Sequence, residues 1–283
     1  MTRRHLEERF FKAVMLLSAL ALAGSLAFIL GTIAWKGLPA LSLDMLTSGP
    51  KGGYYLGKGG GILNAILGSL ALGLGATALA LALSLPIVFY LNIYLRRRSK
   101  FALCVRFFLD VLWGVPSIVY GAFGFTVMAI LGLRASLLAG IITLCLVMLP
   151  IMSRSMDEVL KMVPFALKEA SAAMGSTRLE TALKVVLRQA YPGMLAAVLT
   201  AFGRGIGDAA AVLFTASYTD YLPYSLFKPV ASLPLAIFFQ LGTPFPEVQR
   251  RGYASALVLT AMILAISLGA RSLSRRFTRN VIR

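Results

Sequence analysis

The chain has 283 residues and a mean hydropathy of +0.81, with 58% hydrophobic and only 14% charged residues. A soluble domain carries about 25% charged residues, so this composition excludes an ordinary soluble fold, and its many large apolar residues exclude a disordered chain. The formal net charge of +17 is typical, in so apolar a chain, of basic loops beside a membrane rather than of nucleic-acid binding. The expected fold class is therefore all-α, a polytopic membrane protein.

Six apolar runs are each long enough to cross a bilayer, which takes about 20 helical residues. They are residues 13–34, 66–93, 111–133, 135–153, 189–219 and 252–270. A seventh apolar segment, 229–246, contains four prolines that leave too few uninterrupted residues to span. We expect it to form a short hairpin or re-entrant piece within an outer loop, 220–251.

The basic residues predict the orientation of these spans. Twenty of the 28 lysines and arginines lie inside if four segments are placed in the cytoplasm. These are residues 1–12, the loops 96–106 and 154–188, and the region from the end of the last span through the tail 276–283. Seven lie outside and Arg204 lies in the membrane. This excess of inner positive charge favours six spans within residues 13–275 and both termini inside.

A proline motif, the two cysteines and the single histidine give three further expectations. Gly114-Val115-Pro116 is expected to kink the third span, because proline removes a backbone hydrogen bond; the kink serves either packing or gating. Cys104 and Cys145 lie in apolar runs and are expected to be buried free thiols. His5 is the single histidine, so a histidine-based metal cluster is excluded.

The loop 154–188 carries a helical pattern. Apolar residues recur at helical spacing from Met156 to Met174, and Gly175 suits the position after a helix end. Thr177 and Glu180 match a capping box, so the loop is expected to form two short helices separated at Gly175. Such a loop either rests on lipid as an interfacial helix or docks into a groove of a partner protein.

The same loop contains Glu169-Ala170-Ser171, then Gly175, then Val185-x-Leu187. These residues and their spacing resemble the EAA loop of ABC importer permeases, although Ser171, Val185 and Arg188 replace the alanine, isoleucine and proline of the family pattern. The resemblance implies that Glu169, Ala170, Ser171 and Gly175 belong to a coupling helix that inserts into a separate ATPase subunit.

The chain itself has no phosphate-binding loop for ATP. The most similar segment, Gly57-Lys58-Gly59, lacks the serine or threonine that such a loop requires. ATP and Mg²⁺ would therefore be used by the partner ATPase, and no cofactor is expected in this chain.

The fifth run contains two charged residues, Arg204 and Asp208, which lie on one face if the helix is continuous. An arginine at the bilayer centre costs about 2.5–3.5 kcal/mol on insertion scales. The two side chains would form either an ion pair that fixes packing or an anion site, since a guanidinium binds an oxyanion bidentately. A carboxylate there could accept a hydrogen bond from a protonated oxyanion; phosphate carries such a proton near neutral pH, whereas sulfate does not. Gly203, Gly205 and Gly207 are expected to let helices approach closely.

Three further segments resemble the permeases of ABC phosphate importers. They are Gly203-Arg204-x-x-Gly207-Asp208 with Leu213-Phe214-Thr215, the stretch 112–121, and Ser232-Leu233-Pro234. Asp208 stands where that family usually has glutamate, and Ala211 where it often has proline. The resemblance covers roughly residues 60–275 and implies that Arg204 and Asp208 bind substrate. It also implies a bacterial inner-membrane location, a second permease subunit, an ATPase dimer and an external phosphate-binding protein.

The expected function is that of a non-catalytic permease subunit, which forms half of the pathway of an ATP-driven importer for inorganic phosphate. Alternatives are an ABC permease for another oxyanion or polar solute, and a secondary transporter or channel working alone. A membrane-embedded enzyme is a third alternative, but the sequence offers no Ser/His or metal constellation for it.

Overall fold

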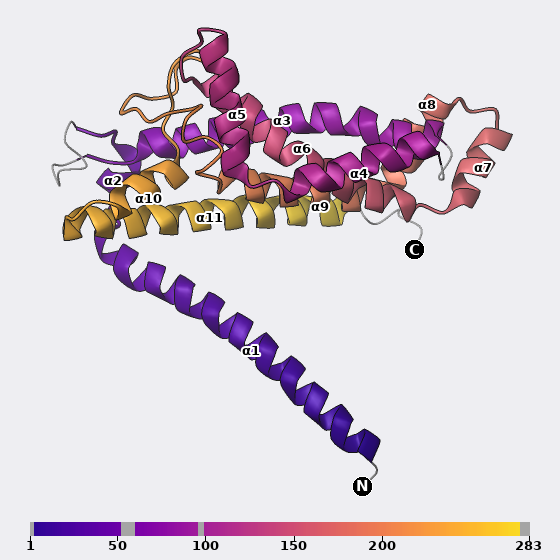
Figure 1. The fold of residues 1–283 in the computed structure, drawn as a ribbon, viewed down its shortest axis with the longest axis horizontal. Coiled ribbons are helices and arrows are strands. Elements are labelled where there is room, and N and C mark those ends of the chain that lie inside the picture. The colour runs from indigo at the N-terminus through magenta and orange to yellow at the C-terminus, as the bar shows by residue number, and fades with distance from the viewer. Residues whose placement is uncertain (1–2, 52–59, 96–98, 278–283) are drawn as a thin grey trace.

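The computed structural model describes residues 3–51, 60–95 and 99–277, and within them every named element is a helix. The helices are α1 (Arg3–Gly37), η1 (Leu38–Ala40), α2 (Leu43–Thr47), α3 (Leu63–Phe89), η3 (Tyr90–Tyr94), α4 (Lys100–Gly114), α5 (Ser117–Ile130), α6 (Leu137–Lys161), α7 (Phe165–Ala173), α8 (Arg178–Glu180), η4 (Thr181–Val186), α9 (Leu187–Ile206), α10 (Leu233–Leu241) and α11 (Pro246–Phe277) (Figure 1). The all-α prediction is confirmed. Gly57–Gly59, part of the basic loop 96–106 and most of the tail 276–283 lie outside the described residues.

The core lies around α6, which packs most extensively against α3 and α9. Met148, Met152 and Met156 of α6 are fully buried there. Helix α3 buries a series of small residues against α6, α9 and the segment before α10, because without bulky side chains two helices in a membrane can approach closely. These buried small residues are Gly68, Ser69, Gly73, Ala76, Ala80 and Ser84. The hydroxyls of Ser84 and Ser153 hydrogen-bond across the α3–α6 contact at 3.0 Å.

Replacing Gly68 by alanine is expected to destabilise the fold. A Cβ atom at position 68 would collide with the carbonyl oxygen of Ala231, which is backbone and cannot rotate away. Overpacking of this kind costs about 1–3 kcal/mol. Thermal unfolding of the full chain in detergent should show a lower midpoint for Gly68→Ala. The control is Gly269→Ala, since Gly269 has open space around it; equal midpoints for the two variants would contradict the prediction.

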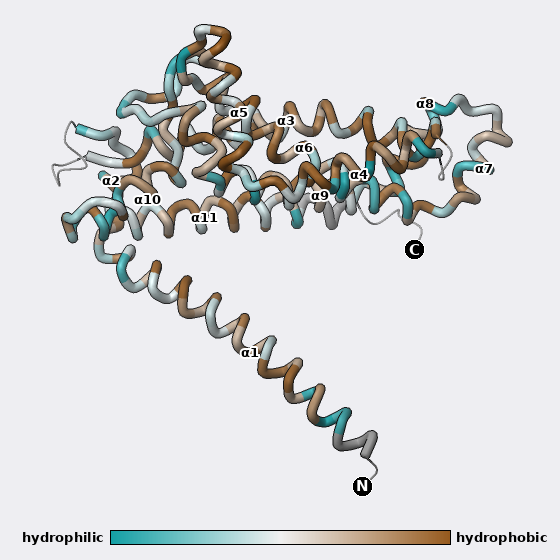
Figure 2. The backbone as a smooth tube through the Cα atoms, viewed as in Figure 1, coloured by the Kyte–Doolittle hydropathy of each residue, from teal (hydrophilic) through white to brown (hydrophobic). Residues whose placement is uncertain are grey.

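Helix α1 leaves the bundle at an angle and touches it near its C-terminal end (Figure 1). There Gly37 packs against the backbone of Tyr253 in α11, and the Lys36 ammonium lies 5.0 Å from the Tyr253 ring centre. Most of α1 is apolar yet exposed (Figure 2). Such a helix is stable where lipid or another membrane segment covers it.

The described residues contain five helical segments long and apolar enough to cross a membrane, and a sixth if the bent pair α4–α5 counts as one span. The five are Glu7–Ala40, Leu63–Tyr94, Leu137–Lys161, Arg178–Ile206 and Pro246–Ser272. The proline-rich segment 229–246 contains α10, a helix of nine residues, and part of the first turn of α11. The prediction that the segment does not span is therefore in agreement with the structure.

The predicted kink of the third span at Gly114-Val115-Pro116 is confirmed, but the predicted bounds of that span, 111–133, are wrong. Its first residues lie in α4, which begins at Lys100, and the axis turns by 97° into α5. The break falls at Val115, because a residue before proline is driven from helical to extended backbone; Val115 has φ −71° and ψ 129°. The Leu112 carbonyl, freed by the break, accepts from the Val115 N–H and the Tyr120 hydroxyl.

The predicted fifth span, 189–219, is also wrong in its bounds. Its helix begins earlier, at Arg178, and ends at Ile206. Gly207 closes it, and the Asp208 carboxylate accepts a hydrogen bond from the Ala211 N–H at 3.0 Å, which starts a turn rather than a further helix. Residues 210–216 then follow as turns.

The thiol prediction is right for one cysteine. Both cysteines are free; Cys145 is buried in the core beside α3 and α9, but Cys104 is exposed. Cys104 lies on α4, whose neighbouring Phe101, Phe107 and Phe108 are exposed as well. An apolar run therefore marks contact with lipid as readily as burial inside the protein.

Candidate functional site

The loop with the EAA resemblance folds largely as predicted. Gly175 takes a left-handed backbone (φ +79°) that ends the first short helix, because glycine has no Cβ to clash there. Thr177 and Glu180 form the capping box, with each side chain bonded to the backbone N–H of the other. The break at Gly175 and the capping box are confirmed.

The start of the first short helix differs from the prediction. Met156 and Leu160 are fully buried in α6, which continues to Lys161, so the first part of the predicted loop is a transmembrane-helix end. The chain turns at Met162–Pro164 and α7 begins at Phe165. Pro164 has extended backbone (ψ 134°) and directly precedes the helix.

The four predicted coupling residues do not share one environment. Glu169, Ala170 and Gly175 are exposed, whereas Ser171 is buried and its hydroxyl hydrogen-bonds with that of Thr181 at 2.9 Å. This bond holds α7 against η4. The residues around α7 also leave large apolar side chains uncovered: Met162 is 73% exposed, Phe165 68% and Met174 86%. Exposed apolar side chains grouped in this way mark a surface for protein or membrane contact.

The structure does not bring Arg204 and Asp208 together. No ion pair forms between these two described residues, because α9 ends at Ile206 and the helical four-residue spacing is lost. Arg204 is exposed and has no hydrogen bond or ion pair with the described part of the chain. Asp208 is half-buried and lines a cavity of about 10 Å³ with Ser69 and Ser232. That cavity has room for about one water molecule, so no closed anion pocket is formed by these residues alone.

The glycines beside Arg204 differ in their packing. A Cβ at Gly205 would meet the Met148 side chain in the core, whereas Gly203 has open space and Gly207 only ordinary contacts. The predicted close approach of helices is therefore confirmed at Gly205 alone.

A buried cluster of charges at the α7 end of the bundle was not predicted from the sequence. Asp157 of α6 is 0% exposed and is held by Arg106 of α4 through two hydrogen bonds of 2.9 and 3.0 Å. Asn92 of η3 donates to the same carboxylate at 2.8 Å. Arg154 and Lys161 approach it at 3.0 and 2.8 Å. Three cations thus surround one buried carboxylate.

Two further carboxylates, those of Asp110 and Glu158, compensate the excess positive charge of this cluster. Arg154 also pairs with Asp110 of α4 at 2.5 Å and with Glu158 at 3.0 Å. Arg106 and Asp157 are 51 residues apart, so no local pattern joins them; the one signal in the sequence is that both lie beside apolar runs.

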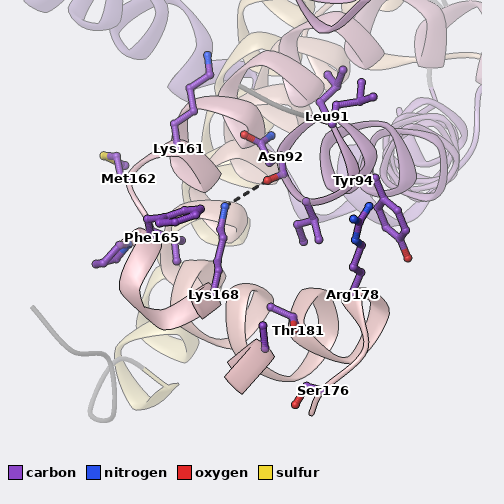
Figure 3. Close-up of a pocket in the computed structure, with 15 residues that line it drawn as sticks. Leu91, Asn92, Tyr94, Lys161, Met162, Phe165, Lys168, Ser176, Arg178 and Thr181 are labelled. Carbon is purple, nitrogen blue, oxygen red and sulfur yellow. Dashed lines mark hydrogen bonds between the residues drawn. The ribbon is translucent and has the colours of Figure 1, made fainter. Parts of the chain in front are cut away.

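A cavity of about 630 Å³ lies between α7 and the end of η3 (Figure 3). Lys168 of α7 reaches across one side of it and donates to the Asn92 carbonyl at 3.2 Å. On the other side the Arg178 guanidinium lies 5.9 Å from the centre of the Tyr94 ring. Among the described residues no group of three metal-ligating side chains is found.

Sequence comparisons place this architecture among transport proteins. Residues 84–283 match the family described as binding-protein-dependent transport system inner membrane component. The chain is 33% identical over 246 residues to the phosphate transport system permease protein PstA of Haemophilus influenzae, covering 87% of this chain and 86% of that one. It is 34% identical to the PstA protein of Xylella fastidiosa strain 9a5c, covering 87% and 84%.

Solved structures share the fold. A chain of the inward-facing MetNI methionine ABC transporter aligns with a TM-score of 0.65 at 20% identity, covering 77% of this chain and 96% of that chain. A chain of a bacterial alginate ABC transporter aligns with a TM-score of 0.63 at 13% identity, covering 97% and 99%. At 20% and 13% sequence identity, these two similarities show a shared fold and no more. From the matched family and the PstA relatives, the chain belongs to the binding-protein-dependent transport system inner membrane components, as a multi-pass permease of the PstA type.

Proposed function

We propose that this permease forms half of the translocation pathway of an ATP-driven importer for inorganic phosphate. The observation that carries the proposal is the similarity to PstA phosphate permeases along 87% of the chain. It is supported by the exposed α7, which projects from one end of the bundle (Figure 1). The chain would perform no covalent chemistry itself.

Both termini and α7 would lie on the cytoplasmic side of the bacterial inner membrane. The charge distribution supports this orientation, since 20 of 28 basic residues then face the cytoplasm. The end that carries α2 and α10 would face outward.

The partners follow from this orientation. An ATPase dimer of the PstB type would bind ATP and Mg²⁺ and receive α7 in a groove, with Phe165, Glu169 and Met174 among the exposed side chains available for contact. A second permease of the PstC type would cover the exposed helices and complete the pathway. A binding protein of the PstS type would deliver phosphate from outside.

Arg204 and Asp208 would contact phosphate transiently. Arg204 is an exposed cation near the end of an apolar helix and has no partner in the described chain, so its guanidinium is available to an oxyanion from the pathway. The Ala211 N–H donates to one oxygen of Asp208, and the other oxygen could accept a hydrogen bond from the P–OH group of hydrogen phosphate. Sulfate carries no such proton near neutral pH. This difference would favour phosphate.

The test is reconstitution of the assembled importer in liposomes. We expect phosphate delivered by the binding protein to stimulate ATP hydrolysis and to accumulate in the lumen. Excess unlabelled phosphate should compete with labelled phosphate, whereas sulfate and molybdate should not. Competition by those anions instead would reassign the substrate to another oxyanion. Uptake by the purified chain without an ATPase would indicate a secondary transporter or channel.

A further inference from the structure

Asp157 is a buried carboxylate with four polar or charged partners. Its carboxylate lies at 0% exposure and contacts residues from three elements, namely Arg106 of α4, Asn92 of η3, and Arg154 and Lys161 of α6 itself. A buried ion pair is weak evidence for stability, because the cost of desolvating the charges offsets their attraction. The bidentate geometry instead fixes the position of α4 relative to α6 with high directional specificity.

Lys168 of α7 is hydrogen-bonded to this cluster. The Lys168 ammonium donates to the main-chain carbonyl of Asn92 at 3.2 Å. The side-chain amide of Asn92 in turn donates to the Asp157 carboxylate at 2.8 Å. Helix α7 has its main packing contacts with η4, and a cavity of about 630 Å³ separates it from the end of η3 (Figure 3). Lys168 therefore bridges a space that apolar packing does not fill.

These hydrogen bonds lead from Lys168 through Asn92 and Asp157 to Arg106, which lies on the bent pair α4–α5. Arg106 lies in α4, eight residues before the end of that helix at Gly114, after which the chain turns by 97° into α5. Charge-assisted hydrogen bonds in a low-dielectric interior are strong and directional, so a group held by them moves with its partner. A displacement of α7 would reach the bent pair through four residues.

We propose that Lys168, Asn92, Asp157 and Arg106 form a polar relay that transmits movement of α7 to α4 and the α4–α5 bend. The proposal rests on the proposed function, in which α7 receives movement from the ATPase. The four residues are positioning residues, since none of them is placed against substrate. Arg154 and Lys161 bind the same carboxylate from its own helix, α6, and are not part of this series.

The experiment measures ATP hydrolysed per phosphate transported by the reconstituted importer. Lys168→Met, Asn92→Ala and Arg106→Gln should each raise this ratio by about tenfold, the lower end of the range for one lost hydrogen bond to a charged group. Because the links act in series, the double variant Lys168→Met/Arg106→Gln should be no worse than the more affected single variant. Arg106→Lys, which keeps the charge, should recover part of the coupling.

Lys161→Met is the matched control, because it removes a cation from the same carboxylate without interrupting the series. Its ratio should stay within about twofold of wild type, even where the unfolding midpoint of the complex falls. A ratio raised as far as in Arg106→Gln would mean that the cluster is purely structural. Multiplied effects in the double variant would also overturn the relay.

A second double variant and the wild-type complex separate failure of the relay from failure of assembly or of the proposed function. If Arg106→Gln fails to assemble, Lys168→Met with Asn92→Ala gives the same test of serial links further from the core. If the wild-type complex shows no phosphate-dependent ATP hydrolysis, the proposed function fails. A coupled wild type with unaffected variants refutes the relay alone.

Discussion

Deleting residues 164–176 is expected to abolish phosphate-stimulated ATP hydrolysis and uptake by the assembled importer while the chain still inserts into the membrane. The deletion removes α7, its exposed apolar side chains and the Gly175 break, and leaves the apolar spans unchanged. Without α7 the ATPase has no projecting element to engage, so hydrolysis should fall to the level of the ATPase alone. Uptake and hydrolysis in liposomes measure both effects.

A glycine–serine segment of the same length in place of residues 164–176 separates the loss of α7 from the shortening of the loop. It retains chain length but has neither the apolar side chains nor a stable helix. We expect the same loss of coupling as in the deletion. Normal coupling with this flexible segment would mean that α7 rests on lipid as an interfacial helix and that the ATPase engages the permease elsewhere.

Arg204→Ala is expected to reduce phosphate uptake by about 10- to 100-fold, the range for a lost hydrogen bond between charged groups. The exposed guanidinium has no partner in the described chain, so its removal takes away a contact for the passing anion without opening the core. Arg204→Lys should retain part of the activity, because an ammonium keeps the charge but not the planar pair of donors. Initial rates of labelled phosphate uptake check this.

The control is Arg271→Ala, which removes an exposed arginine from the end of another apolar helix, α11. It tests whether loss of one positive charge from the bundle is itself harmful. Unchanged uptake by Arg204→Ala in a complex that assembles normally would remove Arg204 from the substrate pathway. Equal losses in both variants would indicate a general electrostatic effect instead of a specific contact.

The candidate site could be predicted where it depends on short-range effects. The end of α7 at Gly175 and the restart at Thr177 were correct, because a left-handed backbone and a capping box are properties of a few neighbouring residues. The shared helix face expected for Arg204 and Asp208 was wrong, because α9 ends at Ile206, two residues before Asp208. Glycine at positions 203, 205 and 207 lowers the cost of ending it there.

The sequence by itself determined the helical class of the chain, its membrane-length apolar runs and the position of the short helices between them. These follow from the length of a helix that crosses hydrocarbon and from local backbone preferences. The tertiary structure alone decided that Asp157 is buried between Arg106 and Asn92, that Lys168 meets the end of η3, and that Cys104 faces outward. Those contacts join residues 51 to 76 positions apart, and the side of a helix that meets a neighbour depends on how the whole bundle packs.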